Sequence, residues 1–71
     1  GDKMTVRELA ELFMRTDPKQ NVLVFENDVE IFDNRIEWLF NCDNPLEERQ
    51  VDTLTVNDYN YSSAVLEIRI K

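Results

Sequence analysis

The apolar residues between positions 5 and 16 recur at the spacing of one helix face, and this segment constrains the fold more than any other. The residues on that face are Val6, Leu9, Ala10, Leu12 and Phe13. Thr5 and Glu8 fit a capping box, in which each side chain bonds the backbone amide of the other residue. Pro18 biases the residue before it away from helical dihedrals. We therefore predict an amphipathic helix over about residues 5–16.

Short apolar or alternating segments follow this helix and have the pattern of β-strands. The predicted strands cover residues 21–26, 29–32, 53–56 and 64–71. Asparagine and aspartate tolerate the dihedrals of tight turns, which matters in a chain whose one glycine is its first residue. The turns and loops expected from such residues are Asn27-Asp28, Asp33-Asn34 and the segment 57–63.

Residues 35–41 have two interpretations. The alternation of Ile36, Trp38 and Phe40 suits a strand. The spacing of Ile36, Leu39 and Phe40 would also suit a short helix. We predict a strand here.

Together these segments predict the α+β class in a single domain, residues 1–71. The N-terminal helix is expected to pack on a mostly antiparallel sheet of four or five short strands, because the connections are too short for parallel crossovers. A helical turn is expected near residues 44–49, where Pro45 can occupy the first helical position. Residues 1–3 precede Met4 and are expected to derive from an expression vector.

The composition limits the chemistry and the partners of the chain. It has 71 residues, a net charge of −7, one cysteine and no histidine. Neither an intramolecular disulfide nor a Cys/His zinc site can form, and we expect no cofactor. The negative charge disfavours direct binding to nucleic acid and to anionic lipid surfaces. A lone thiol, with no secretory or membrane-spanning pattern, predicts a cytoplasmic protein.

Catalytic and metal-binding groups are scarce. Glu37 and Asp43, near Trp38, are the candidate acid and base for a carboxylate-based enzyme, but a thin core hardly forms the pocket that such chemistry needs. Cys42 has no basic neighbour that would activate its thiol. An acidic spacing that resembles a calcium loop fails because Ile31 stands where the loop requires glycine. We therefore predict no catalytic residue and no metal site.

The candidate partner-binding residues are acidic or aromatic. They are Glu26, Asp28, Glu30, Asp33, Trp38, Tyr59 and Tyr61. The four acidic residues lie in a segment without basic residues and give it a local charge of −4, which is either functional or only solubilising. The tyrosines lie among small polar residues, a composition that provides contact area at interfaces. The tryptophan and its apolar neighbours belong either to the core or to an interface.

Three segments together carry a resemblance to a group of proteins. They are Thr5-Val6-Arg7-Glu8-Leu9, Val22-Leu23-Val24-Phe25 and Leu66-Glu67-Ile68-Arg69-Ile70. In this order, and over most of the chain, they resemble small uncharacterised α+β proteins encoded in phage and prophage genomes of Gram-positive bacteria. The resemblance implies a phage–host setting and carries no particular activity with it.

The leading hypothesis for function is a non-enzymatic cytosolic module that binds an unknown protein partner. Its sharpest form is an inhibitor that imitates DNA, in which carboxylates along the 26–33 hairpin take the place of phosphates in a basic groove. A small carboxylate-based hydrolase, or a domain that completes a larger enzyme, is the enzymatic alternative. A homodimer or larger homo-oligomer, joined through an exposed edge strand or the Trp38 face, is the structural alternative.

Overall fold

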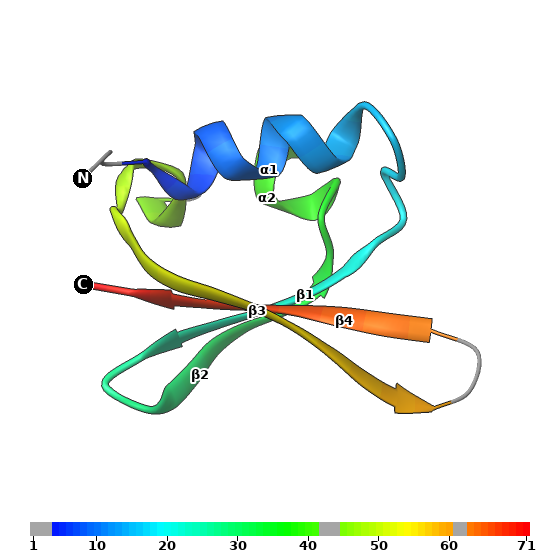
Figure 1. Cartoon of the computed structure of the whole chain (residues 1–71). Coiled ribbons are helices and arrows are strands. Elements are labelled where there is room, and N and C mark those ends of the chain that lie inside the picture. The colour runs from blue at the N-terminus through cyan, green and yellow to red at the C-terminus, as the bar shows by residue number, and fades with distance from the viewer. Residues whose placement is uncertain (1–3, 42–44, 61–62) are drawn as a thin grey trace.

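The computed structural model describes residues 4–41, 45–60 and 63–71, and it has two layers (Figure 1). One layer is a four-stranded sheet, and the other consists of helices that cover one of its faces. The elements in chain order are α1 Val6–Met14, β1 Asn21–Glu26, β2 Val29–Arg35, α2 Trp38–Asn41, the 3-10 helix η1 Pro45–Glu48, β3 Val51–Asn60 and β4 Ser63–Ile70. The predicted α+β class is confirmed, and η1 is the helical turn expected near residues 44–49.

Helix α1 begins at the predicted capping box. The backbone amide of Glu8 donates to Oγ1 of Thr5 at 3.1 Å, and the amide of Thr5 donates to Oε1 of Glu8 at 3.1 Å. The helix ends at Met14, after which the amides of Thr16 and Asp17 both donate to the carbonyl of Phe13. At the N-terminal end, the capping box satisfies two backbone amides that would otherwise be unpaired. The start of this helix therefore follows from the sequence alone.

The sheet has the strand order β2-β1-β4-β3. Each outer strand pairs antiparallel with its neighbour, whereas the two central strands, β1 and β4, pair parallel. The sheet is therefore mixed, and two of its three pairings are antiparallel. The expectation that short connections exclude parallel neighbours failed at the centre, because β1 and β4 are separated by β2, α2, η1 and β3 rather than by a single short connection.

The core lies between α1 and the sheet face beneath it. Its buried residues are Val6, Leu9, Ala10, Val22, Val24, Ile36, Leu39, Leu66, Ile68 and Ile70. They alternate along β1 and β4 with residues that point to the opposite face, as the period of two in a strand requires. One face of the sheet is therefore buried against the helices, and its other face is left to solvent.

The predicted strand at residues 35–41 is wrong. Strand β2 ends at Arg35, and α2 follows, so that Leu39 is fully buried while Trp38 is 43% exposed. The amide of Ile36 donates to the carbonyl of Gln20 at 2.7 Å, which holds the chain as it leaves the sheet. A helical turn buries Ile36 and Leu39 together, whereas a strand would turn them to opposite faces.

Two predicted turns are also wrong, because strand pairing prevails over local turn propensity. Asp33 and Asn34 lie in β2, opposite Leu23 and Val22 of β1. The loop expected at residues 57–63 is shorter, since β3 continues to Asn60 and β4 begins at Ser63. The turn at Asn27-Asp28 is confirmed, with φ angles of 51° and 64°.

Candidate functional site

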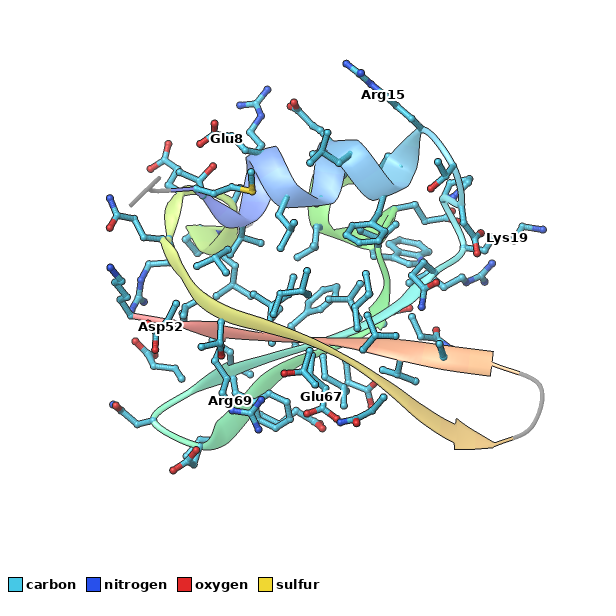
Figure 2. The ribbon with its side chains drawn as sticks, in the orientation of Figure 1. Glu8, Arg15, Lys19, Asp52, Glu67 and Arg69 are labelled. Carbon is cyan, nitrogen blue, oxygen red and sulfur yellow. The ribbon has the colours of Figure 1, made fainter. Side chains whose placement is uncertain are left out.

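One face of the sheet is covered by no element in the described part of the chain, and we call it the open face. Its residues are Leu23, Phe25, Glu30, Asp33, Thr53, Thr55, Asn57, Glu67 and Arg69, as strand parity and cross-strand register place them. Figure 2 shows Glu67 and Arg69 on the side of the sheet away from α1. The open face combines Leu23 and Phe25 on β1 with Glu67 and Arg69 on β4, acidic residues on β2 and threonines on β3.

Arg69 organises the centre of the open face. Its guanidinium carbon lies 4.9 Å from the centroid of the Phe25 ring, a cation–π contact. Its Nη1 donates to Oε1 of Glu67 at 3.5 Å, and Nδ2 of Asn57 donates to the other carboxylate oxygen of Glu67. Glu67 is only 5% exposed, so this carboxylate is held by its donors rather than by water. The centre of the face is thus built from three strands and has a defined geometry.

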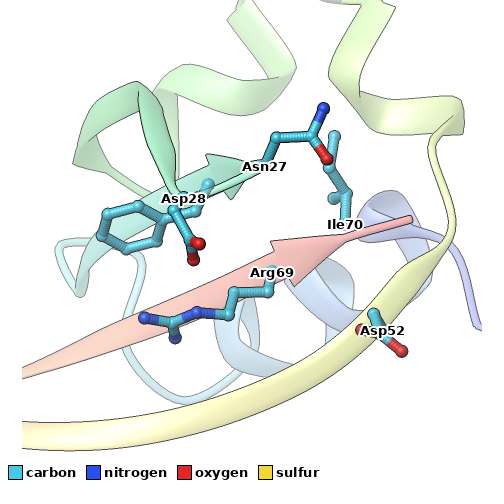
Figure 3. Close-up of a pocket in the computed structure, with 6 residues that line it drawn as sticks. Asn27, Asp28, Asp52, Arg69 and Ile70 are labelled. Atoms are coloured by element: carbon cyan, nitrogen blue, oxygen red, sulfur yellow. The ribbon is translucent and has the colours of Figure 1, made fainter.

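A small pocket lies at one end of the open face (Figure 3). It has a volume of about 170 Å³ and is lined by Phe25, Asn27, Asp28, Asp52, Arg69 and Ile70. The carboxylates of Asp28 and Asp52 come from the β1–β2 turn and the start of β3, and Arg69 lies between these two segments. Sites for drug-sized ligands have volumes of about 300–1,000 Å³, so this pocket suits a single side chain instead.

The predicted acidic residues divide into two groups. Glu26 points to the helix-covered side, where Nη2 of Arg49 donates to its Oε2 and also to the carbonyl of Lys71. Asp28, Glu30 and Asp33 are exposed and lie at the pocket and on the open face. Three of the four predicted carboxylates therefore lie on one side of the molecule.

Of the predicted aromatic residues, Trp38 lies apart from this group. Trp38 belongs to α2, in the helical layer on the opposite side of the sheet. Tyr59 lies in β3, and Tyr61 is outside the described residues. Another pocket, of about 290 Å³, is lined by Glu11, Met14, Arg15 and Phe40.

The enzymatic alternative was based on Glu37 and Asp43, near Trp38. Neither pocket is lined by Trp38 or Glu37, and Asp43 and Cys42 lie outside the described residues. Among residues 4–41, 45–60 and 63–71, no three or more His, Cys, Asp and Glu side chains form a group that could hold a metal ion. No helix among the same residues is long and apolar enough to cross a membrane.

Sequence reasoning missed Arg69, Glu67, Asn57 and Asp52. A signal for the first two existed, because both alternate with the core residues of β4 and so must point away from the core. Their neighbours depend on the parallel pairing of β1 with β4, for which the sequence has no local signal.

Comparison with protein-family models, with curated proteins and with solved structures gave no match to this chain.

Proposed function

We propose that the protein is a non-enzymatic binding module whose open face binds a basic surface of a partner protein. The observation that carries this proposal is the position of Asp28, Glu30 and Asp33, which are exposed beside the apolar residues Leu23 and Phe25 on a sheet face without a covering helix. Aromatic residues and arginine are enriched at protein–protein interfaces, whose rims are polar.

The apolar residues of β1 supply contact area. Leu23 and Phe25 are half-buried within the chain, so part of each side chain remains available to a partner. The Phe25 ring is already held by Arg69, and an ordered aromatic–arginine pair loses little freedom on binding. This part of the face would contribute affinity.

The acidic residues around the centre of the open face would make that face selective for a basic partner. Asp28 and Asp52 line a pocket sized for one side chain, and Glu30 and Asp33 extend the negative charge along β2. The two carboxylates outnumber the guanidinium of Arg69, which lines the same pocket and lies over the Phe25 ring, so the cationic head of a partner's lysine or arginine would meet a net negative charge there. Carboxylates on the rim also raise the association rate with a basic surface and make it dependent on salt.

The setting of this proposal is the cytosol. A chain with one cysteine suits a reducing compartment. The resemblance to phage- and prophage-encoded proteins supports a host protein as the partner.

The DNA-imitating inhibitor is the narrower form of the same proposal. It is favoured by one observation, namely that three carboxylates follow one another along the β1–β2 turn and β2 rather than being scattered. In this form the partner is a DNA-binding protein, and DNA competes with this chain for the partner.

The test is a pull-down from lysate of the source cell at low and high salt, with the tagged protein and two charge-matched variants. The first variant, D28N/E30Q/D33N, removes the open-face carboxylates. The second, E11Q/E47Q/E48Q, removes the same charge from α1 and η1, which lie on the helix-covered side. Both should keep the far-ultraviolet circular dichroism spectrum of the parent.

The proposal expects one stoichiometric partner that is retained by the parent and by the α1/η1 variant, but lost with the open-face variant and at high salt. Equal retention by both variants, or no specific partner, would overturn it. Release of the partner by added duplex DNA would establish the DNA-imitating form, and retention in its presence would exclude that form.

A further inference from the structure

The two edges of the sheet differ in how they are protected against pairing with another strand. The β2 edge carries charged residues, and its register with β1 shifts at Val24/Phe25, which marks a bulge. The β3 edge is regular from Thr53 to Asp58, with register shifts only outside that stretch. Between Thr53 and Asn57 it has neither a charged residue nor a proline. Charges, prolines and bulges are the devices that keep edge strands unpaired, and this stretch of β3 has none of them.

Exposed apolar side chains accompany this edge on the helix-covered side of the sheet. Leu54 is 39% exposed and Val56 is 57% exposed, although they lie opposite the core residues Ile68 and Leu66 of β4. They remain exposed because β3 is the outermost strand. The core therefore continues to the edge of the sheet without a cover.

Leu12 of α1 is a further exposed apolar residue, with 52% of its surface accessible. Met14 lies on the flank of α1 that meets Phe40 of α2, since the two line one pocket, and helical geometry places Leu12 on the opposite flank. In Figure 1, α2 lies behind α1, and β3 crosses in front of the other strands, below α1, so the flank of α1 away from α2 is on the β3 side of the molecule. We call Leu12, Leu54 and Val56 the edge strip.

We propose that the β3 edge and the edge strip form the contact between two copies of this chain, with the β3 strands paired antiparallel about a two-fold axis at Thr55. Within Thr53–Asn57 the β3 sequence is self-complementary in this register, because Leu54 of each copy faces Val56 of the other on the helix-covered side. Thr53 faces Asn57 on the open face, so polar positions also meet polar positions. Just outside this stretch the same register sets Asp52 opposite Asp58, a like-charge pair that opposes the contact. The result is one continuous sheet whose free edges are the two bulged β2 strands.

The surface area that a stable dimer must bury determines which elements belong to the contact. A standard interface buries about 800 Å² on each partner. That is roughly a sixth of the 5006 Å² accessible surface of this chain. A strand edge alone is a narrow ribbon, so the contact reaches this size only if the Leu12 flank of α1 joins it. We therefore expect all three residues of the edge strip to be buried in the dimer.

Charge gives this contact a signature that differs from partner binding. Each copy carries a net charge of −7, and the stretch of β3 at the two-fold axis is uncharged. Added salt screens the repulsion between copies and so strengthens the dimer. Salt weakens binding of the open face to a basic partner, so failure of one proposal can be distinguished from failure of the other.

The test is sedimentation equilibrium of the purified chain between about 5 and about 500 µM, a range that spans micromolar dissociation constants. The expected result is a mass that rises with concentration from 8.5 kDa to twice that value. The variant V56K should raise the dissociation constant at least tenfold. The control V29K places the same charge at a residue that is 61% exposed on the other edge, and should leave the dissociation constant unchanged or lower.

A mass of 8.5 kDa at every concentration would overturn the proposal and leave the edge to a strand of a different protein. An equal rise of the dissociation constant in V56K and V29K would also overturn it, because the dimer contact would then not be specific to the β3 edge.

The register has its own test by cross-linking in a Cys42→Ala background. Facing residues of an antiparallel pair have Cβ atoms close enough for a disulfide, so Thr55→Cys should form a covalent dimer under mild oxidation. Thr53→Cys, whose facing residue is Asn57, should not. Cross-linking of both variants to the same extent, or of neither, would refute this register.

Discussion

Replacing Asp28 with glycine should stabilise the fold while weakening the proposed partner site. The β1–β2 turn holds Asn27 at φ 51° and Asp28 at φ 64°, both in the left-handed region. Two-residue hairpins of this type prefer Asn-Gly because both central residues need positive φ. The sequence supplies the asparagine and lacks the glycine.

The magnitude follows from two opposing terms. A residue with a Cβ atom loses about 1–2 kcal/mol in the left-handed region, with aspartate toward the lower end. Glycine avoids that cost but loses about 0.5–1 kcal/mol through the greater freedom of its unfolded chain. The expected gain for Asp28→Gly is therefore about 0.5 kcal/mol, which raises Tm by roughly 2–4 °C in a domain of this size.

Asp33→Gly is the matched control, since it makes the same chemical and charge change inside β2, opposite Leu23. Glycine in a strand interior costs about 0.5–1 kcal/mol, so its Tm should fall. Thermal unfolding followed by circular dichroism measures both. If Asp28→Gly lowered Tm as Asp33→Gly does, the turn would not be strained and the reasoning would be wrong.

Three further changes test other parts of the structure. Thr5→Ala removes the hydroxyl of the capping box and should cost about 1 kcal/mol in urea unfolding; no change would mean that the box does not hold the helix end. Leu39→Ala leaves a cavity at a fully buried site and should cost about 2–5 kcal/mol of unfolding free energy, so most molecules should lose the native circular dichroism spectrum. Trp38→Ala changes a partly exposed residue and should remain folded. If Trp38→Ala unfolded the chain and Leu39→Ala did not, residues 35–41 would form the strand predicted from the sequence. Glu26→Gln breaks a half-exposed ion pair with Arg49 and should cost less than about 1 kcal/mol by the same urea assay; a larger loss would show that the pair is a structural link between β1 and the η1–β3 segment.

The local elements follow from the sequence wherever neighbouring residues decide them. The capping box starts α1 at its predicted place, and the apolar run of β1 gives its bounds, Asn21–Glu26, because both patterns act over a few residues. The Asn27-Asp28 turn belongs to the same class. Asp33-Asn34 has similar turn chemistry yet lies in β2, since pairing with β1 satisfies its backbone and a turn would break the ladder.

Only part of the candidate site could be predicted from the sequence. Its carboxylates are visible as an acidic run, but their division is not, because Glu26 is taken up by Arg49, 23 positions later in the chain. The pairing of Phe25 with Arg69 joins strands 44 residues apart and depends on the parallel contact of β1 with β4. No local pattern encodes which strands become neighbours.

The sequence by itself determined the class of this protein: one amphipathic helix, alternating strands, and an acidic surface without catalytic histidine. Tertiary structure alone decided the strand order, the burial of Leu39 instead of Trp38, and which face stays open. The physical reason is that secondary structure is set by periodicity and capping within a few residues. Strand partners and buried faces are set by the burial of apolar surface over the whole chain.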